Sequence, residues 1–124
     1  MPNNPLNIVA KDRPGYLYVS VASATTTRAK MLDWLGELAL LSAETRKLCI
    51  LLDRDIPDFV MDEHLGDAFK QVCNCRAGIR LAVVNRHPIV GENMKTALVN
   101  LGKLTPNVEF FEHVHEAERW LLEG

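Results

Sequence analysis

Apolar and polar positions divide the chain into short strands and longer amphipathic helices. Three apolar runs have the length and composition of strands, and they lie at residues 48–52, 79–84 and 108–111. The first run ends at Asp53 and the second at Asn85. Because these runs lack strict polar alternation, we expect helices on both faces of the sheet that they form.

A β-hairpin is predicted ahead of these runs. Residues 8–11 and 16–21 are β-prone, and residues 12–15 between them read Asp-Arg-Pro-Gly. Proline presets φ and glycine accepts a positive φ, so this tetrapeptide is typical of a turn.

The first helix is predicted to begin at the hydroxyl side chains of residues 25–27 and to end at about Ala43. Its buried stripe is expected to consist of Met31, Leu32, Leu35, Leu38, Ala39 and Ser42. Trp34 and Leu41 are placed off this stripe, seven residues apart. We therefore expect these two side chains to form a spare apolar face that makes a homodimer contact.

Three further helices follow from the same spacing. Their apolar positions are Leu65, Ala68, Phe69 and Val72, then Met94, Ala97, Leu98 and Leu101, and finally Ala117, Trp120 and Leu121. Strands that alternate with helices through short connections predict right-handed crossovers and an α/β fold. We expect one domain over residues 1–124, with a mostly parallel sheet of about five strands, a β-hairpin start and about four helices. Residues 1–6 are expected to be a flexible N-terminal extension.

Composition limits the partners of this domain. Of the 124 residues, 48% are hydrophobic and 24% are charged, which is typical of an ordered globular protein. Fourteen basic and sixteen acidic side chains leave a net charge of −2. This near balance gives no electrostatic reason to expect nucleic acid or a membrane as a partner.

The chain shows no signal for secretion or membrane insertion. Its start lacks a cationic flank followed by an apolar stretch, and the apolar residues 31–41 are interrupted by Asp33 and Glu37. A membrane span needs roughly 18 residues with few or no charges. Three cysteines, an odd number, favour a reduced protein, so we expect a cytoplasmic location.

Three segments carry a resemblance to a known family. The run Ile50-Leu51-Leu52-Asp53 is similar to the family's apolar strand that ends in an acid, and residues 59–65 are similar to the segment that leads into its regulatory helix. Residues 110–121 are similar to the tail of a SpoIIAA-like branch. On these residues, the chain resembles the STAS family, which includes the bacterial anti-sigma-factor antagonists.

The resemblance implies regulation through protein binding. In the antagonists, an Asp-Ser pair opens the regulatory helix, and phosphorylation of the serine switches partner binding. The matching positions here are Asp62 and Glu63, so the phosphorylatable hydroxyl is missing. Two roles stay open: Glu63 is a permanent, weak imitation of phosphoserine, or Asp62 caps the helix and Glu63 complements its positive end.

The carboxyl ends of the strands are the expected interaction surface, since open α/β sheets bind ligands there. The expected contact residues are Asp53, Asp55, Asp62, Glu63, His64 and Asn85. We therefore predict a non-catalytic regulatory or protein-interaction domain with no cofactor and no metal. An alternative is a protein that binds a small lipid-like or anionic ligand.

A further alternative is a phosphatase. Residues 50–55 also resemble the first motif of haloacid-dehalogenase-type phosphatases, a resemblance that implies Asp53 as nucleophile and Asp55 as general acid beside Mg²⁺. However, Pro57 stands where that family has a small β-branched residue, and Asn85 stands where it has a hydroxyl. We therefore predict no catalytic residue at this motif.

Overall fold

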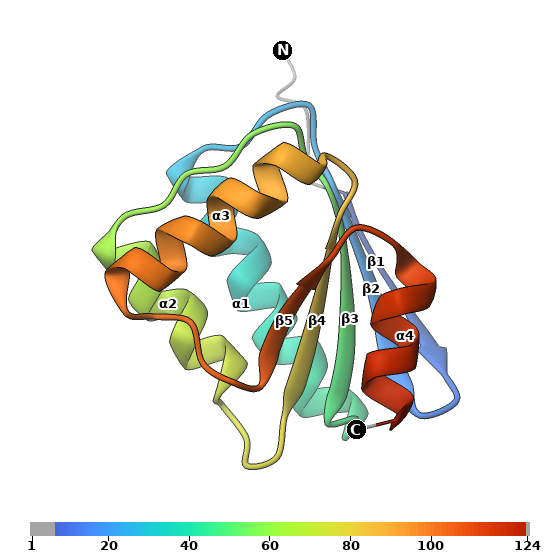
Figure 1. Cartoon of the computed structure of the whole chain (residues 1–124). Helices are drawn as coiled ribbons and strands as arrows, with labels where there is room; N and C mark the ends of the chain where they lie inside the picture. The colour runs from blue at the N-terminus through green and yellow to red at the C-terminus, as the bar shows by residue number, and fades with distance from the viewer. Residues whose placement is uncertain (1–6, 124) are drawn as a thin grey trace.

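The sheet follows the order of the chain. The computed structural model describes residues 7–123, and its five strands lie in the order β1-β2-β3-β4-β5 (Figure 1). Their bounds are Asn7–Arg13 for β1, Tyr16–Ala22 for β2, Cys49–Asp55 for β3, Arg80–Asn85 for β4 and Val108–Phe111 for β5. β1 pairs antiparallel with β2, and the other neighbours are parallel. The predicted hairpin and the mostly parallel sheet are confirmed, whereas the predicted extension at residues 1–6 lies outside the described residues.

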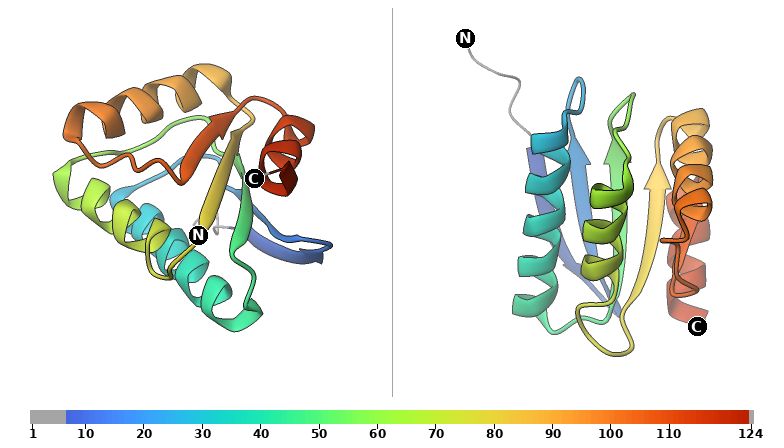
Figure 2. Two further views of the ribbon diagram at one scale, coloured as in Figure 1. Left: turned by 60° about the horizontal axis from the view of Figure 1, so that its bottom comes forward. Right: turned by 90° about the vertical axis from the view of Figure 1, so that its left-hand side faces the viewer.

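Four helices cover the sheet unequally. Helices α1 (Arg28–Thr45), α2 (Glu63–Cys73) and α3 (Pro88–Leu101) lie on one face, and α4 (Val114–Glu123) lies alone on the other, as the left view of Figure 2 shows. The prediction of an α/β protein with helices on both faces is confirmed. None of the described helices is both long and apolar enough to cross a membrane.

Strand alternation divides the core into two clusters. The larger cluster lies under α1, α2 and α3, and its strand residues include Leu17, Val19, Val21, Ile50, Leu52, Leu81 and Val83. The smaller cluster lies under α4 and consists of Tyr16, Leu51, Ala82, Val84, Ala117 and Leu121. Because successive side chains of a strand point to opposite faces, Asp53 and Asp55 lie on the α4 side and Arg54 lies on the other.

The helix ends follow the predicted chemistry. Thr27 is the N-cap of α1, and its side chain accepts a hydrogen bond from the Lys30 amide at 3.2 Å. This helix ends at Thr45, two residues beyond the predicted end. Gly102 closes α3 in the left-handed conformation with φ of 70°, a backbone geometry that glycine adopts without steric cost.

The prediction that Trp34 lies on a spare surface is wrong. Trp34 is 1% exposed and belongs to the larger core cluster, and Leu41 is partly buried against the same cluster. The spacing of Met31, Trp34, Leu35 and Leu38 is the i, i+3, i+4, i+7 pattern of a single helix face. Trp34 therefore stabilises the monomer core and is unavailable for a dimer contact.

Candidate functional site

The carboxyl ends of β2, β3 and β4 form one edge of the sheet, and α1, α2 and α3 each begin on the side of this edge (Figure 1). Ser20, Asp53 and Val84 are neighbours across these three strands. The polar residues that end β3 and β4 therefore share one edge, as the sequence predicts. Their side chains do not all meet, because Asp53 and Asp55 lie on the α4 side of the sheet and Asn85 lies on the three-helix side.

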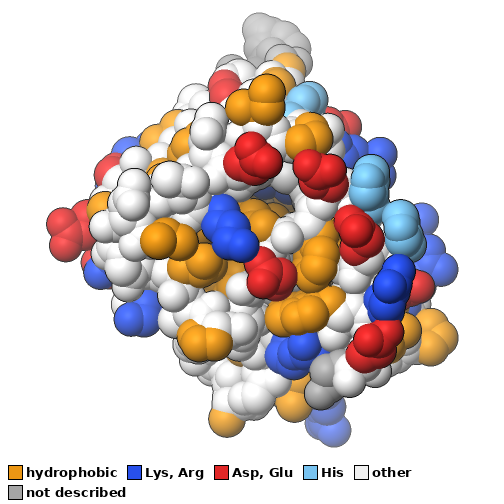
Figure 3. Space-filling model, viewed as in Figure 1, with side chains coloured by type: hydrophobic (Ala, Val, Ile, Leu, Met, Phe, Trp, Pro, Cys, Tyr) orange, Lys and Arg blue, Asp and Glu red, His pale blue; other side chains and the backbone are white. Residues whose placement is uncertain are grey.

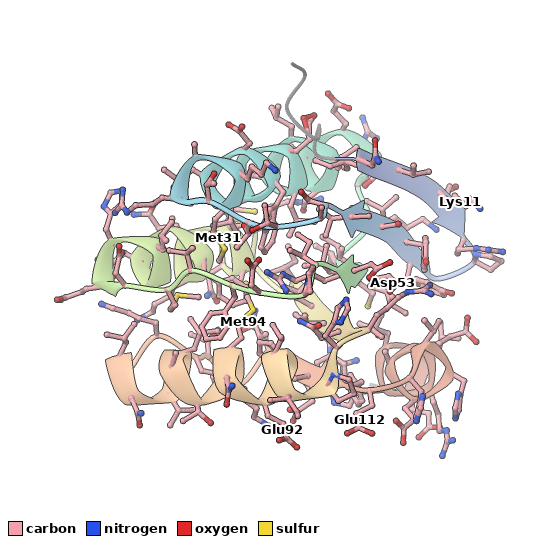
Figure 4. The ribbon with its side chains drawn as sticks, turned by 90° about the horizontal axis from the view of Figure 1, so that it is seen from above. Lys11, Met31, Asp53, Glu92, Met94 and Glu112 are labelled. Atoms are coloured by element: carbon pink, nitrogen blue, oxygen red, sulfur yellow. The ribbon has the colours of Figure 1, made fainter. Side chains whose placement is uncertain are left out.

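Asp53 lies at the centre of a hydrogen-bonded cluster on the α4 side of the sheet. Its two carboxylate oxygens accept hydrogen bonds from Arg86 Nε at 3.0 Å and Arg86 Nη2 at 2.8 Å. The Tyr18 hydroxyl donates to the same carboxylate. The Asp53 side chain is 1% exposed, whereas that of Arg86 is 56% exposed. Figure 4 shows Asp53 pointing away from the three-helix side of the sheet.

The surroundings of Asp53 keep this carboxyl ionised. Burial, the largest single influence, acts to raise its pKa, but hydrogen bonds from Arg86 and Tyr18 and the charge of Arg86 outweigh it and lower the pKa. Burial and the hydrogen bond to Asp53 raise the pKa of Tyr18, so its hydroxyl stays a donor. The cluster is an anion held by one cation and one neutral donor.

The exposed part of the edge lies beside this cluster. His87 Nε2 lies 3.0 Å from Asp55 Oδ1, and both side chains are substantially exposed. Together with Ala22, Ser23 and Pro57 they line an open depression of about 460 Å³. Asp55 is thus accessible, unlike Asp53.

Arg54 holds the loop that follows β3. Its side chain is fully buried on the three-helix side, and it donates to the carbonyl of Ile56 at 3.1 Å and to that of Asp58 at 2.6 Å. The Asp58 carboxylate in turn accepts hydrogen bonds from the Thr26 amide and the Thr25 hydroxyl, each at 2.7 Å. Burial lowers the pKa of Arg54 to about 10, and the nearby charge of Asp58 opposes this shift. The two loops at the edge are therefore tied together.

Asn85 lies on the same side as Arg54, its cross-strand neighbour. It is 2% exposed and lines a cavity of about 200 Å³ between α3 and the end of β5. Its Oδ1 accepts a hydrogen bond from the His87 amide at 3.1 Å. Among the described residues, its Nδ2 has no partner. The sequence singled out Asn85 but gave no sign of this cavity.

Asp62, Glu63 and His64, which the sequence assigns to an interaction surface, lie at the start of α2. Asp62 is the N-cap and accepts a hydrogen bond from the Leu65 amide at 2.8 Å. It also pairs with Arg28 of α1 at 3.0 Å, and the hydrogen bonds from Arg28 and from this amide lower its pKa. Glu63 and His64 are exposed in the first turn. This geometry is that of the capping role, which was one of the two roles that the sequence left open.

Potential metal ligands do not gather in the described part of the chain. No group of three or more His, Cys, Asp or Glu side chains there is arranged to hold a metal ion. Cys73 is buried and Cys75 is exposed, so the two thiols face different surroundings. The rings of His113 and His115 stack with centroids 5.6 Å apart.

No protein-family model matches the chain, and no curated protein matches it either.

Proposed function

We propose that the chain is a non-catalytic protein-interaction domain of the STAS type, whose partner docks on the carboxyl edge of the sheet. The state of Asp53 carries this proposal. An attacking carboxylate needs an open approach to its substrate, but Asp53 is 1% exposed and both its oxygens accept hydrogen bonds. Its charge is already balanced by Arg86, so it acts as a structural anion.

The edge around Asp53 has the composition of a recognition surface. Arg86, Asp55 and His87 present exposed charged or titratable groups. Ile89, in the first turn of α3, is 73% exposed, which is the largest exposure among the large hydrophobic side chains that are exposed in the described chain. An apolar anchor rimmed by polar groups is typical of an interface centre. Loops that are fixed by Arg54 and Asp58 keep this surface ordered before a partner binds.

The start of α2 is proposed as the second part of the surface. Glu63 and His64 are exposed there, and Asp62 is fixed by its bond to Leu65 and its pair with Arg28. Glu63 replaces the serine that the antagonists phosphorylate, so binding at this surface is proposed to be constitutive. The homodimer stays a prediction, which light scattering of the purified protein tests.

A pair of variants on one helix tests the proposal. Candidate partners are isolated with the tagged chain from its source cells, purified separately, and titrated by calorimetry against the wild type. Ile89→Asp is expected to weaken the affinity at least about tenfold, as loss of an interface anchor does. The control Val99→Asp changes a side chain of the same helix that is 55% exposed, and it is expected to leave the affinity unchanged. Equal effects of the two variants, or no saturable partner, would refute the docking surface.

A further inference from the structure

β1 is an outer strand of the sheet, and Figure 1 shows it at the edge away from β5. It pairs only with β2, and six of its seven residues are exposed. Every second residue of an outer antiparallel strand turns its N–H and C=O groups away from the neighbouring strand. Among the described residues, β1 forms no backbone hydrogen bond beyond this pairing, and only its Arg13 carbonyl has a side-chain donor, Lys47 at 2.6 Å. The edge of β1 can therefore accept another strand.

The opposite outer strand, β5, is less open. It has only four residues, and both α3 and α4 contact it. Its Phe110 amide already donates to the Glu109 carboxylate at 3.0 Å. Figure 3 shows the face around β5, where acidic and basic side chains are mixed around a central hollow. β1 is thus the longer and more accessible of the two edges.

The pairing with β2 assigns the side chains of β1 to the two faces of the sheet. Lys11 and Arg13 lie directly opposite the two β2 tyrosines that belong to the cluster under α4. Directly opposed residues share a face, so both basic side chains are on the α4 side. Ile8 packs against the larger core cluster, so Ile8 and Ala10 are on the three-helix side. The two faces of this edge therefore differ in character.

The α4 side of β1 is basic. Lys11 and Arg13 are exposed, and neither forms an ion pair within residues 7–123. Asp53, Asp55 and Glu118 on the same side of the sheet each have a partner already. Figure 4 shows Lys11 on β1, at the outer rim of the sheet. The two basic side chains thus lack an anionic partner in the described chain.

We propose that β1 binds an extended acidic segment of another protein as an additional strand of the sheet. Backbone hydrogen bonds hold the segment, and acidic side chains opposite Lys11 and Arg13 supply the specificity. Apolar side chains of the segment lie opposite Ile8 and Ala10 on the other face. A second copy of this chain fits less well, because pairing through β1 would gather the basic side chains of both copies on one face.

This surface is separate from the carboxyl edge. Lys11 and Arg13 pair with the beginning of β2, next to the hairpin turn, whereas the carboxyl edge lies at the other end of β2. Binding at β1 therefore does not depend on the docking surface proposed above, and each surface can fail its own test while the other stands.

Three short peptides test the proposal on the unaltered protein. The acidic peptide, Glu-Thr-Glu-Val-Thr-Val, is designed to lie opposite residues 8–13 in the antiparallel direction, which is the slightly more stable pairing. A basic peptide has lysine in place of each glutamate. A third peptide keeps the glutamates but is N-methylated at every amide, so it cannot donate to β1. Each peptide is titrated at millimolar concentration into the isotopically labelled full chain, and the backbone amide signals of β1 are followed by NMR.

The acidic peptide is expected to shift the β1 signals saturably. It is expected to bind about tenfold more tightly than either of the other two peptides, a difference of about 1.4 kcal/mol. The proposal is overturned if the acidic peptide leaves these signals unshifted, or if the basic or the methylated peptide binds as tightly.

A matched pair of double variants tests the charges. Lys11→Glu with Arg13→Glu is expected to reverse the preference, so that the basic peptide binds about tenfold more tightly than the acidic one. The control, Lys70→Glu with Arg119→Glu, makes the same change in net charge at exposed bases of α2 and α4 and is expected to keep the wild-type preference. A folded charge-reversed variant that still prefers the acidic peptide would also overturn the proposal. If circular dichroism shows that this variant is unfolded, the three peptides on the wild type decide alone.

Discussion

Replacing Arg86 with methionine is expected to destabilise the fold strongly, because it leaves Asp53 buried with only Tyr18 as a side-chain donor. Arg86 makes two hydrogen bonds to this carboxylate, at 3.0 and 2.8 Å. Removing one partner of a buried ion pair costs about 3–5 kcal/mol. Since the Arg86 side chain is 56% exposed, water compensates part of this loss, and we expect about 2–3 kcal/mol.

The cost of this substitution is expected to depend on pH. In the wild type the pKa of Asp53 is lowered, so its stabilisation is present above the unfolded value of about 3.9 and is lost as the pH falls through the folded pKa. Without Arg86, burial is the dominant influence and raises the pKa of Asp53 above about 3.9. The variant then takes up a proton on folding at mildly acidic pH. The difference in free energy of unfolding between the wild type and the variant therefore becomes smaller as the pH falls.

Urea unfolding followed by circular dichroism measures both effects. The free energy of unfolding is determined for the wild type, Arg86→Met and the control Arg119→Met at about pH 7 and about pH 4.5. Arg119 is exposed on α4, so its replacement is expected to change stability by less than about 0.5 kcal/mol. If Arg86→Met cost no more than the control, or if its cost were the same at both pH values, Asp53 would not be the paired anion described above.

Two further predictions concern packing and burial. Gly91→Ala is expected to destabilise the protein by about 1–3 kcal/mol, because its Cβ would lie 2.9 Å from that of Asn85, whereas Gly36→Ala, with open space around it, is expected to stabilise α1 by about 0.5–1 kcal/mol. Thermal unfolding measures both, and similar shifts for the two variants would contradict the close approach. Burial raises the pKa of the Cys73 thiol, so iodoacetamide is expected to label exposed Cys75 in the native protein and Cys73 only after unfolding. Mass spectrometry distinguishes the sites, and rapid native labelling of Cys73 would refute its burial.

The sequence predicted the fold because its local signals agree with each other. The Pro14-Gly15 turn, the hydroxyl cap at Thr27 and the closing Gly102 each favour one conformation, and each lies where an element begins or ends. The apolar runs then alternate with helices, and short connections leave few possible topologies. Trp34 was predicted to lie outside the buried face of α1 because that face is broader than the predicted stripe.

The details of the edge depend on tertiary register. In the continuous run that forms β3, periodicity does not reveal which face of the sheet each side chain lies on. The sequence therefore could not predict that Asp53 is buried on one face and Arg54 on the other. The pairing of Asp53 with Tyr18 follows only when β2 and β3 are aligned. The cavity likewise needs α3 and β5 side by side, and its residues are far apart in the chain.

The central claim is that Asp53 is a structural anion, so that the edge recognises a partner without catalysis. Hydrolysis of an aryl phosphate with added Mg²⁺ tests this claim most directly, using the wild type and Asp53→Asn, with circular dichroism to verify that both are folded. We predict that the wild type shows no hydrolysis above the level of the variant. Turnover by the wild type that Asp53→Asn abolishes while remaining folded would contradict the claim and make Asp53 a nucleophile.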